Sequence, residues 1–299
     1  MRIRTVAFTL MLAFTSVAHA CINSVGTDHT GRTFDLNWYV GQTMTQNIVE
    51  QSTRKYWLSR AAKTVQAARA QPDFRNLTNL GVLLIYQGQY DLAARHFLFV
   101  EQRFPGHHET AANLGTALEL SGYDEVALKW IRIGIRRNAH EHQGSEWLHA
   151  RILQAKISLA RDPAYLNSHS VVGIAFGPGL VPALPPDSDL PAGNDGLPLK
   201  PWDLDQALSY QLHERTQFVP PKDPIVANLL LDWATLNLAG GPIENADALY
   251  RAAIMYGAPR DALMRRRQDL IKQTLAKANS TKARAPGNTC AICMPHPGD

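Results

Sequence analysis

Four residues near the two ends of the chain have side chains that can bind a metal ion or form a covalent bond. Cys290, Cys293 and His296 lie in the last ten residues, and Cys21 is the remaining cysteine. Together they could supply four ligands to a tetrahedral zinc ion, although the ligands would have to come from opposite ends of the chain. In an oxidising compartment, cysteines form disulfides instead. We therefore expect a disulfide, either between Cys290 and Cys293 or between Cys21 and one of them, and we keep metal binding as an alternative.

A second set of possible metal ligands is spaced by about 34 residues. It contains two pairs of histidines with an acidic residue beside each pair, namely His107 with His140, His108 with His142, and Glu109 and Glu141. In stacked repeats these residues would occupy corresponding turns, where a divalent metal could bridge them. Exposed turn histidines without a ligand are the other interpretation, and we adopt it.

The usual motifs of catalytic sites are absent from the sequence. It contains no G-x-S-x-G, H-E-x-x-H or G-x-x-x-x-G-K-[ST] element. The acidic segment 187–196 does not fit an EF-hand, because Pro191 and Pro198 fall on ligand positions. We therefore predict no catalytic residue, no cofactor and no enzymatic activity. An enzyme with a site beneath the proline-rich segment remains an alternative.

The elements that would position these groups include a helical repeat. The stretch NLGVLLIYQGQYDLAARHF begins at Asn79, and NLGTALELSGYDEVALKW begins 34 residues later at Asn113. In the first unit, Gly81 and Ala93 are small, whereas Tyr90 and Phe97 are large. Small side chains let two antiparallel helices approach closely, while large ones fill the space beside them. The sequence therefore predicts two consecutive helical hairpins.

This spacing resembles the tetratricopeptide repeat (TPR) family. Leu80-Gly81, Gly88, Tyr90, Ala93, Phe97 and Pro105 stand at the intervals that the repeat shows. Leu77 and Leu84 replace the Trp and Tyr that are usual there, and the second unit is one residue shorter in its turn. The resemblance covers residues 73–137 and, with weaker matches, most of the remainder. It implies an all-α fold, a TPR-like solenoid of helical hairpins interrupted by a Pro/Gly-rich insertion.

The resemblance also implies a function. In the family, the first helices of the pairs line a concave groove that holds a segment of a protein or peptide partner. The corresponding groove positions here are Arg75, Thr78, Val82, Ile85, Tyr86, Glu109, Ala112, Thr116, Glu119 and Leu120. We therefore expect a protein-interaction scaffold. The metal-binding envelope protein and the enzyme stay as the two alternatives.

Helical periodicity and turn signals divide the rest of the chain. Residues 43–51 and 56–70 are expected to pair as a degenerate first unit, and Asp223-Pro224 to open a later pair. Residues 177–201 hold seven prolines and four glycines, which predicts a long loop. The expected divisions are 1–20 signal peptide, 21–42 irregular segment, 43–162 TPR-like solenoid, 163–201 insertion, 202–278 C-terminal helices and 279–299 flexible tail with the CxxC motif.

The first twenty residues have the pattern of a secretory signal. Arg2 and Arg4 precede an apolar run, and Ala18 and Ala20 mark a cleavage site before Cys21. We expect an exported protein of the periplasm or cell envelope. Cys21 would be the first mature residue, so a lipid anchor there is an alternative to a disulfide.

Net charge argues against a nucleic-acid partner. The formal net charge is +4, and loss of Arg2 and Arg4 with the signal lowers it further. Basic residues gather late, around Arg265 to Arg267, but no aromatic residues alternate with them as single-strand binding requires. We expect this segment to be the solvated face of a terminal helix.

Overall fold

In the computed structural model, residues 24–36, 38–281 and 290–293 are described, and they form a mostly helical protein. The expected helical class is therefore confirmed. Its elements are β1 (Ser24–Thr27), β2 (Thr33–Leu36), α1 (Gln42–Val49), α2 (Ser52–Ser59), α3 (Ala61–Ala70), α4 (Phe74–Tyr86), α5 (Tyr90–Arg103), α6 (His108–Leu120), α7 (Asp124–Arg137), η1 (Glu141–Gly144), α8 (Glu146–Arg161), η2 (Tyr165–Asn167), η3 (Asp187–Asp189), α9 (Pro201–Thr216), α10 (Pro224–Gly240), α11 (Ile243–Tyr256) and α12 (Ala262–Thr281). Within these described ranges, no helix combines the length and apolar character that crossing a membrane requires.

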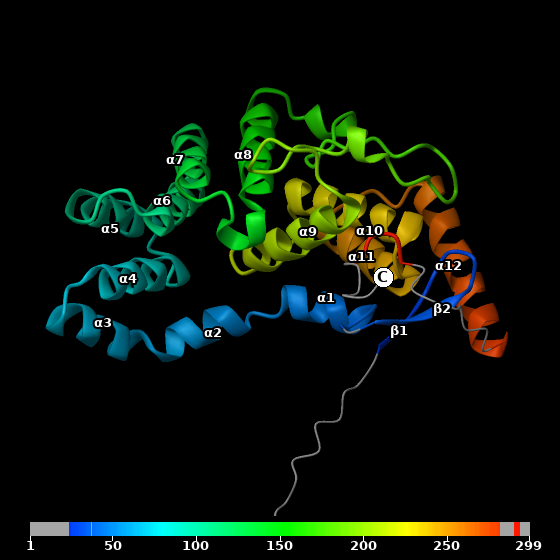
Figure 1. Ribbon diagram of the computed structural model, residues 1–299, viewed down its shortest axis with the longest axis horizontal. Helices are drawn as coiled ribbons and strands as arrows, with labels where there is room; N and C mark the ends of the chain where they lie inside the picture. The colour runs from blue at the N-terminus through cyan, green and yellow to red at the C-terminus, as the bar shows by residue number, and fades with distance from the viewer. Residues whose placement is uncertain (1–23, 37, 282–289, 294–299) are drawn as a thin grey trace, which may run out of the picture.

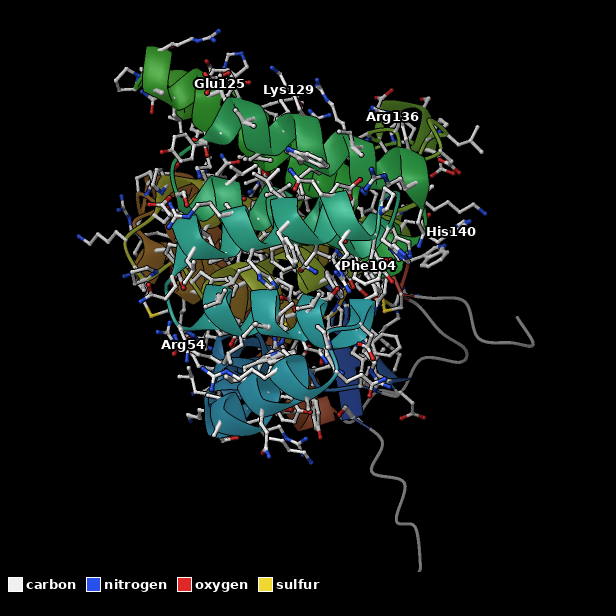
Figure 2. All side chains as sticks on the ribbon, turned by 90° about the vertical axis from the view of Figure 1, so that its left-hand side faces the viewer. Arg54, Phe104, Glu125, Lys129, Arg136 and His140 are labelled. Carbon is white, nitrogen blue, oxygen red and sulfur yellow. A yellow bond between two sulfur atoms is a disulfide. The ribbon has the colours of Figure 1, made fainter. Side chains whose placement is uncertain are left out.

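Helices α3 to α8 pack each on the next along the chain. Figure 1 shows α3 to α7 at the left of the molecule, and Figure 2 looks onto them from that side, where they lie in successive layers. Small and large residues meet within each pair as the sequence predicts. A Cβ on Gly81 of α4 would lie 2.4 Å from the ring of Phe97 on α5, and one on Gly115 of α6 would lie 2.5 Å from Ile131 on α7. The glycines thus permit the close approach of these helices.

The residues before this array do not form the expected hairpin. Residues 56–70 are divided at Arg60 into the separate helices α2 and α3. Helix α1 packs on α9 and α11, whereas α3 packs on α4. In Figure 1, α1, α2 and α3 follow one another in a row along the lower edge of the molecule. The prediction that 43–51 would pair with 56–70 is therefore wrong, because α1 finds its apolar partners in the C-terminal helices.

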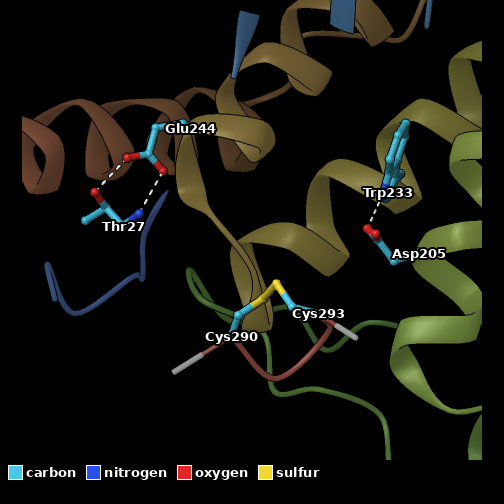
Figure 3. The surroundings of a disulfide bond; sticks show 6 residues. All are labelled: Thr27, Asp205, Trp233, Glu244, Cys290 and Cys293. Carbon is cyan, nitrogen blue, oxygen red and sulfur yellow. Dashed lines mark hydrogen bonds between the residues drawn. A yellow bond between two sulfur atoms is a disulfide. The ribbon is translucent and has the colours of Figure 1, made fainter. Parts of the chain in front are cut away.

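The segment 21–42, expected to be irregular, contains a β-hairpin. Strands β1 and β2 pair antiparallel, with Val25 opposite Asp35. The hairpin is attached to α11, because the backbone N–H and the hydroxyl of Thr27 donate to the Glu244 carboxylate at 3.0 and 2.6 Å (Figure 3). Phe34 and Leu36 are buried in the main core. Cys21 lies outside the described residues.

The main core lies among α8 to α12. Its central side chains include Trp233 of α10 and Tyr250 of α11, both almost completely buried. Helix α9 is tied to α10 by the indole N–H of Trp233, which donates to Asp205 at 2.6 Å (Figure 3). This bond and the surrounding apolar packing fix the orientation of α9, which forms one wall of the candidate site.

The insertion is a long loop, as predicted, but it packs on the C-terminal helices. Val172 and Leu190 join the main core. The Arg267 guanidinium of α12 donates to the carbonyl oxygens of Gly179 and Leu180. In Figure 1 this segment runs across the upper edge of the molecule from α8 towards α12.

The CxxC motif lies on the core and is not a flexible tail. Cys290 and Cys293 form a disulfide, which is one of the two pairings that the sequence left open. Ile292 is 1% exposed, and the Ala291 N–H donates to the carbonyl oxygen of Gly240 at 2.8 Å. Figure 3 shows the disulfide loop beside the end of α10. The expectation of a flexible tail is thus wrong for residues 290–293, because the apolar Ile292 packs against Gly241 and Ala291 against Gly240.

Candidate functional site

A cavity of about 140 Å³ lies between α4 and α6 on one side and η1, α8 and α9 on the other. In Figure 1 these elements face one another across the middle of the molecule. Each helix contributes one face, as the spacing of its lining residues shows. The lining residues are Val82, Ile85 and Tyr86 of α4; Asn113, Thr116, Glu119 and Leu120 of α6; His142 of η1; Glu146 and His149 of α8; Tyr210, Gln211, Glu214 and Arg215 of α9; and Phe218 and Val219 after it.

One wall of the cavity is aromatic. The rings of Tyr86 and Phe218 have centroids 5.0 Å apart, and Trp57 stacks on Tyr86 at 6.1 Å. Tyr210 stacks on the His142 ring at 5.3 Å. Burial, and after it the charge of Glu214, raise the pKa of both Tyr86 and Tyr210. The two phenols therefore remain protonated at neutral pH and can donate hydrogen bonds.

Glu119 is the centre of a buried ion network beside this wall. Its carboxylate accepts from Arg215 Nη2 at 2.8 Å and from Lys156 Nζ at 3.2 Å through one oxygen, and from His149 Nε2 at 2.7 Å through the other. Burial alone would raise the pKa of Glu119, but the charge of Arg215 and the bonds from His149 and Lys156 hold it well below its usual range. Glu119 is thus an ionised group that joins α6 to α8 and α9.

The network continues from His149 to Glu146 and His142. Burial alone would lower the pKa of His149, but its bonds to Glu119 and Glu146 outweigh burial and raise it to about 9. Burial alone would raise the pKa of Glu146, but the bonds from His142 and His149 lower it to about 2. His149 is therefore protonated at neutral pH. The pKa of His142 is also raised, because its bond to Glu146 outweighs burial. The ionised carboxylates of Glu119 and Glu146 and the protonated ring of His149 therefore keep their charges at neutral pH.

Six of the ten predicted groove positions line the cavity, namely Val82, Ile85, Tyr86, Thr116, Glu119 and Leu120. The other four do not. Arg75 lies at the opposite end of α4, where it lines a separate surface hollow near Trp57. Thr78 is half-buried, Glu109 lies beside His108, and Ala112 is buried.

The structure adds a wall that the groove prediction lacked. Glu146 and His149 are three residues apart on α8, and Tyr210 and Glu214 are four apart on α9, which are one-face spacings on a helix. His142 lies in η1 before α8, and Phe218 follows α9. Helical spacing in the sequence indicates the faces of α8 and α9 separately. Nothing in it placed α9 opposite α4 and α6, because that contact joins residues more than ninety positions apart.

The predicted metal ligands are not gathered into a site. Among the described residues, no group of three or more His, Cys, Asp or Glu side chains is arranged to hold a metal ion. His108 pairs with Glu141 at 2.8 Å, while His142 pairs with Glu146. The sulfurs of Cys290 and Cys293 are joined to each other, and His296 lies outside the described residues.

The segment 163–201 contributes no residue to the cavity lining. The alternative of a site beneath the proline-rich insertion therefore does not describe this cavity. Comparison with known protein families finds no family model that matches the chain, and comparison with curated proteins finds no match.

Proposed function

We propose that this protein is an exported interaction scaffold that holds a segment of a protein or peptide partner in the cavity between α4, α6, α8 and α9. The observation that carries the proposal is the lining itself: six side chains come from the faces of α4 and α6 where a TPR-like groove would lie. The cavity combines apolar and aromatic side chains with convergent polar and charged groups, and a concave pocket with such placed polar groups is a typical binding site.

The proposal includes a TPR-like arrangement of the helices in residues 73–137. The pairs α4 with α5 and α6 with α7, the glycines at their crossings and the sequential packing from α3 to α8 support it. In such an array the first helix of each pair faces the inner surface. The same surface is closed here by α9, so a partner segment would enter between helical walls.

Export is the second part of the proposal. The signal-like first twenty residues lie outside the described part, and the disulfide between Cys290 and Cys293 is the bond expected of an oxidising compartment. Whether Cys21 carries a lipid is tested by the mass of the mature N-terminus.

The test is photocrosslinking in living cells of the native source. A photoreactive amino acid is placed either at Val82, which lines the cavity, or at Leu98, an exposed residue of α5 outside it. We expect a discrete crosslinked species from position 82 that position 98 does not give, and mass spectrometry identifies the partner. Equal labelling from both positions, or none from position 82, would contradict the proposal.

A further inference from the structure

Glu214 differs from the other charged residues that line the cavity. It lies on α9, it is half-buried, and its carboxylate has no hydrogen bond or ion pair with any residue of the described part. Its charge acts on the Tyr86 and Tyr210 phenols and on His142, which places it among the aromatic side chains. A half-buried carboxylate in no direct ion pair is costly to keep dehydrated, so the site favours a cation that can bind Glu214 directly.

The other acidic and basic side chains around the cavity are paired with one another. Cations and carboxylates are connected by N to O distances of 2.5 to 3.6 Å. The basic groups are His108, His142, His149, Lys156 and Arg215, and the carboxylates are Glu119, Asp124, Glu141 and Glu146. None of these ion pairs includes Glu214, whose carboxylate is therefore open to a cation from a bound partner.

The walls near Glu214 suit a cation that has an apolar stem. Tyr86, Tyr210 and Phe218 line the cavity, and aromatic rings attract cations. Val82, Ile85 and Leu120 supply aliphatic surface to the same cavity. Lysine and arginine combine a cationic head with an aliphatic stem, and such side chains bury the stem while the head finds a charged or aqueous partner.

We propose that the cavity takes a basic side chain, lysine or arginine, of the partner segment, with its cation on Glu214 and its stem against the walls from α4 and α6. This inference rests on the proposed function and names the chemistry of the bound segment. An acidic side chain is disfavoured, because every cation that lines the cavity already contacts a carboxylate.

The experiment uses the full mature chain and a random displayed peptide library as the probe. Selected peptides are synthesised and their affinities measured by fluorescence anisotropy, each beside a version with norleucine in place of lysine or citrulline in place of arginine. We expect selected peptides to carry a basic residue whose neutral replacement weakens binding about tenfold. Glu214→Gln should weaken the basic peptide by a similar factor and leave the neutral peptide unchanged, as a pairwise interaction requires.

The matched control is Glu125→Gln, on the exposed part of α7 and away from the cavity (Figure 2). It should leave both affinities unchanged, and the thermal midpoints of both variants show whether each is folded. Peptides that crosslink to the photoreactive residue at position 82 but need no basic side chain, or need an acidic one, would overturn this inference and leave the proposed function standing. If no peptide is selected and position 82 labels nothing in cells, the proposed function fails and this inference fails with it.

Discussion

His149 is the residue on which the buried ion network depends. It lies between Glu119 and Glu146, and its side chain is 8% exposed. We expect His149→Gln to lower the free energy of unfolding by up to about 3 to 5 kcal/mol, because Glu119 then keeps only Arg215 and Lys156 as basic partners, and Glu146 only His142. Chemical denaturation measures the loss. Arg251→Ala is the control: its ion pair with Asp247 is on the surface, with Arg251 61% exposed, and should contribute less than about 1 kcal/mol.

The raised pKa of His149 also predicts how stability depends on pH. The imidazolium is surrounded by Glu119 of α6 and Glu146 of α8, and Arg215 and Lys156 bind the far side of Glu119. A folded pKa of about 9 against the ordinary 6.5 means that the folded state holds this proton more tightly. The contribution is fully present below pH 6.5 and is lost as pH rises towards 9. Denaturation midpoints across this range should fall in the wild type.

In His149→Gln, the decline in stability that His149 causes between pH 6.5 and 9 should disappear.

Asp232 contributes a separate decline in stability at lower pH, because burial raises its pKa to about 7, even though Ser170 donates a hydrogen bond to it. Its contribution is present below its ordinary pKa of 3.8 and is lost as pH rises through 7. The His149 contribution is lost between pH 6.5 and 9, whereas most of the Asp232 contribution is lost between pH 3.8 and 7. The effect of His149→Gln above pH 7 therefore reports on His149. A His149→Gln profile parallel to the wild type above pH 7 would refute this assignment.

At the scale of elements, the crossing of α4 and α5 depends on Gly81. A methyl group there would lie 2.4 to 2.8 Å from three atoms of the Phe97 ring, which is fully buried. We expect Gly81→Ala to cost about 1 to 3 kcal/mol through overpacking. Gly134→Ala in α7 is the matched control, because its new methyl group would have ordinary contacts of 3.5 Å or more. Alanine favours a helix by up to about 1 kcal/mol over glycine, so the control should be as stable as the wild type or more so.

Elements with strong local signals could be predicted from the sequence. Asp73 accepts from the Asn76 N–H and begins α4, and Asp223 accepts from the Val226 N–H and begins α10. These bonds join residues three positions apart, so capping residues and periodicity suffice to locate the helices. The Gly81 and Phe97 contact was also predictable, since both lie within one hairpin.

Elements whose position depends on distant contacts could not be predicted. The β-hairpin is attached through Thr27 to Glu244, 217 residues away. The Gly41 N–H before α1 donates to Asn245 of α11. This bond helps to hold α1 against α11, so α1 does not pair with α2 or α3. The second wall of the cavity has the same origin, because Arg215 reaches Glu119 across 96 positions. Helical periodicity shows which face of α9 is apolar but not which helix that face meets.

At the scale of the whole molecule, both ends of the described chain are fastened near α11. The first strand bonds to Glu244, while the disulfide loop rests on the glycines between α10 and α11. Ile292 contacts Gly241 so closely that a Cβ on this glycine would lie 2.6 Å from the Ile292 side chain. Residues 290–293 thus belong to the main core, which also contains the buried side chains of α9.

Ile292→Ala tests this role of the loop. Removing buried methyl groups should lower the free energy of unfolding by about 2 to 5 kcal/mol, because Ile292 is 1% exposed. Leu197→Ala in the insertion is the control, since Leu197 is 64% exposed and should contribute less than about 0.5 kcal/mol. Denaturation of both variants under oxidising conditions gives the comparison. Equal stability of the two variants would show that residues 290–293 lie on the core without stabilising it, whereas the expected difference would make the C-terminal loop part of the fold that positions the cavity wall.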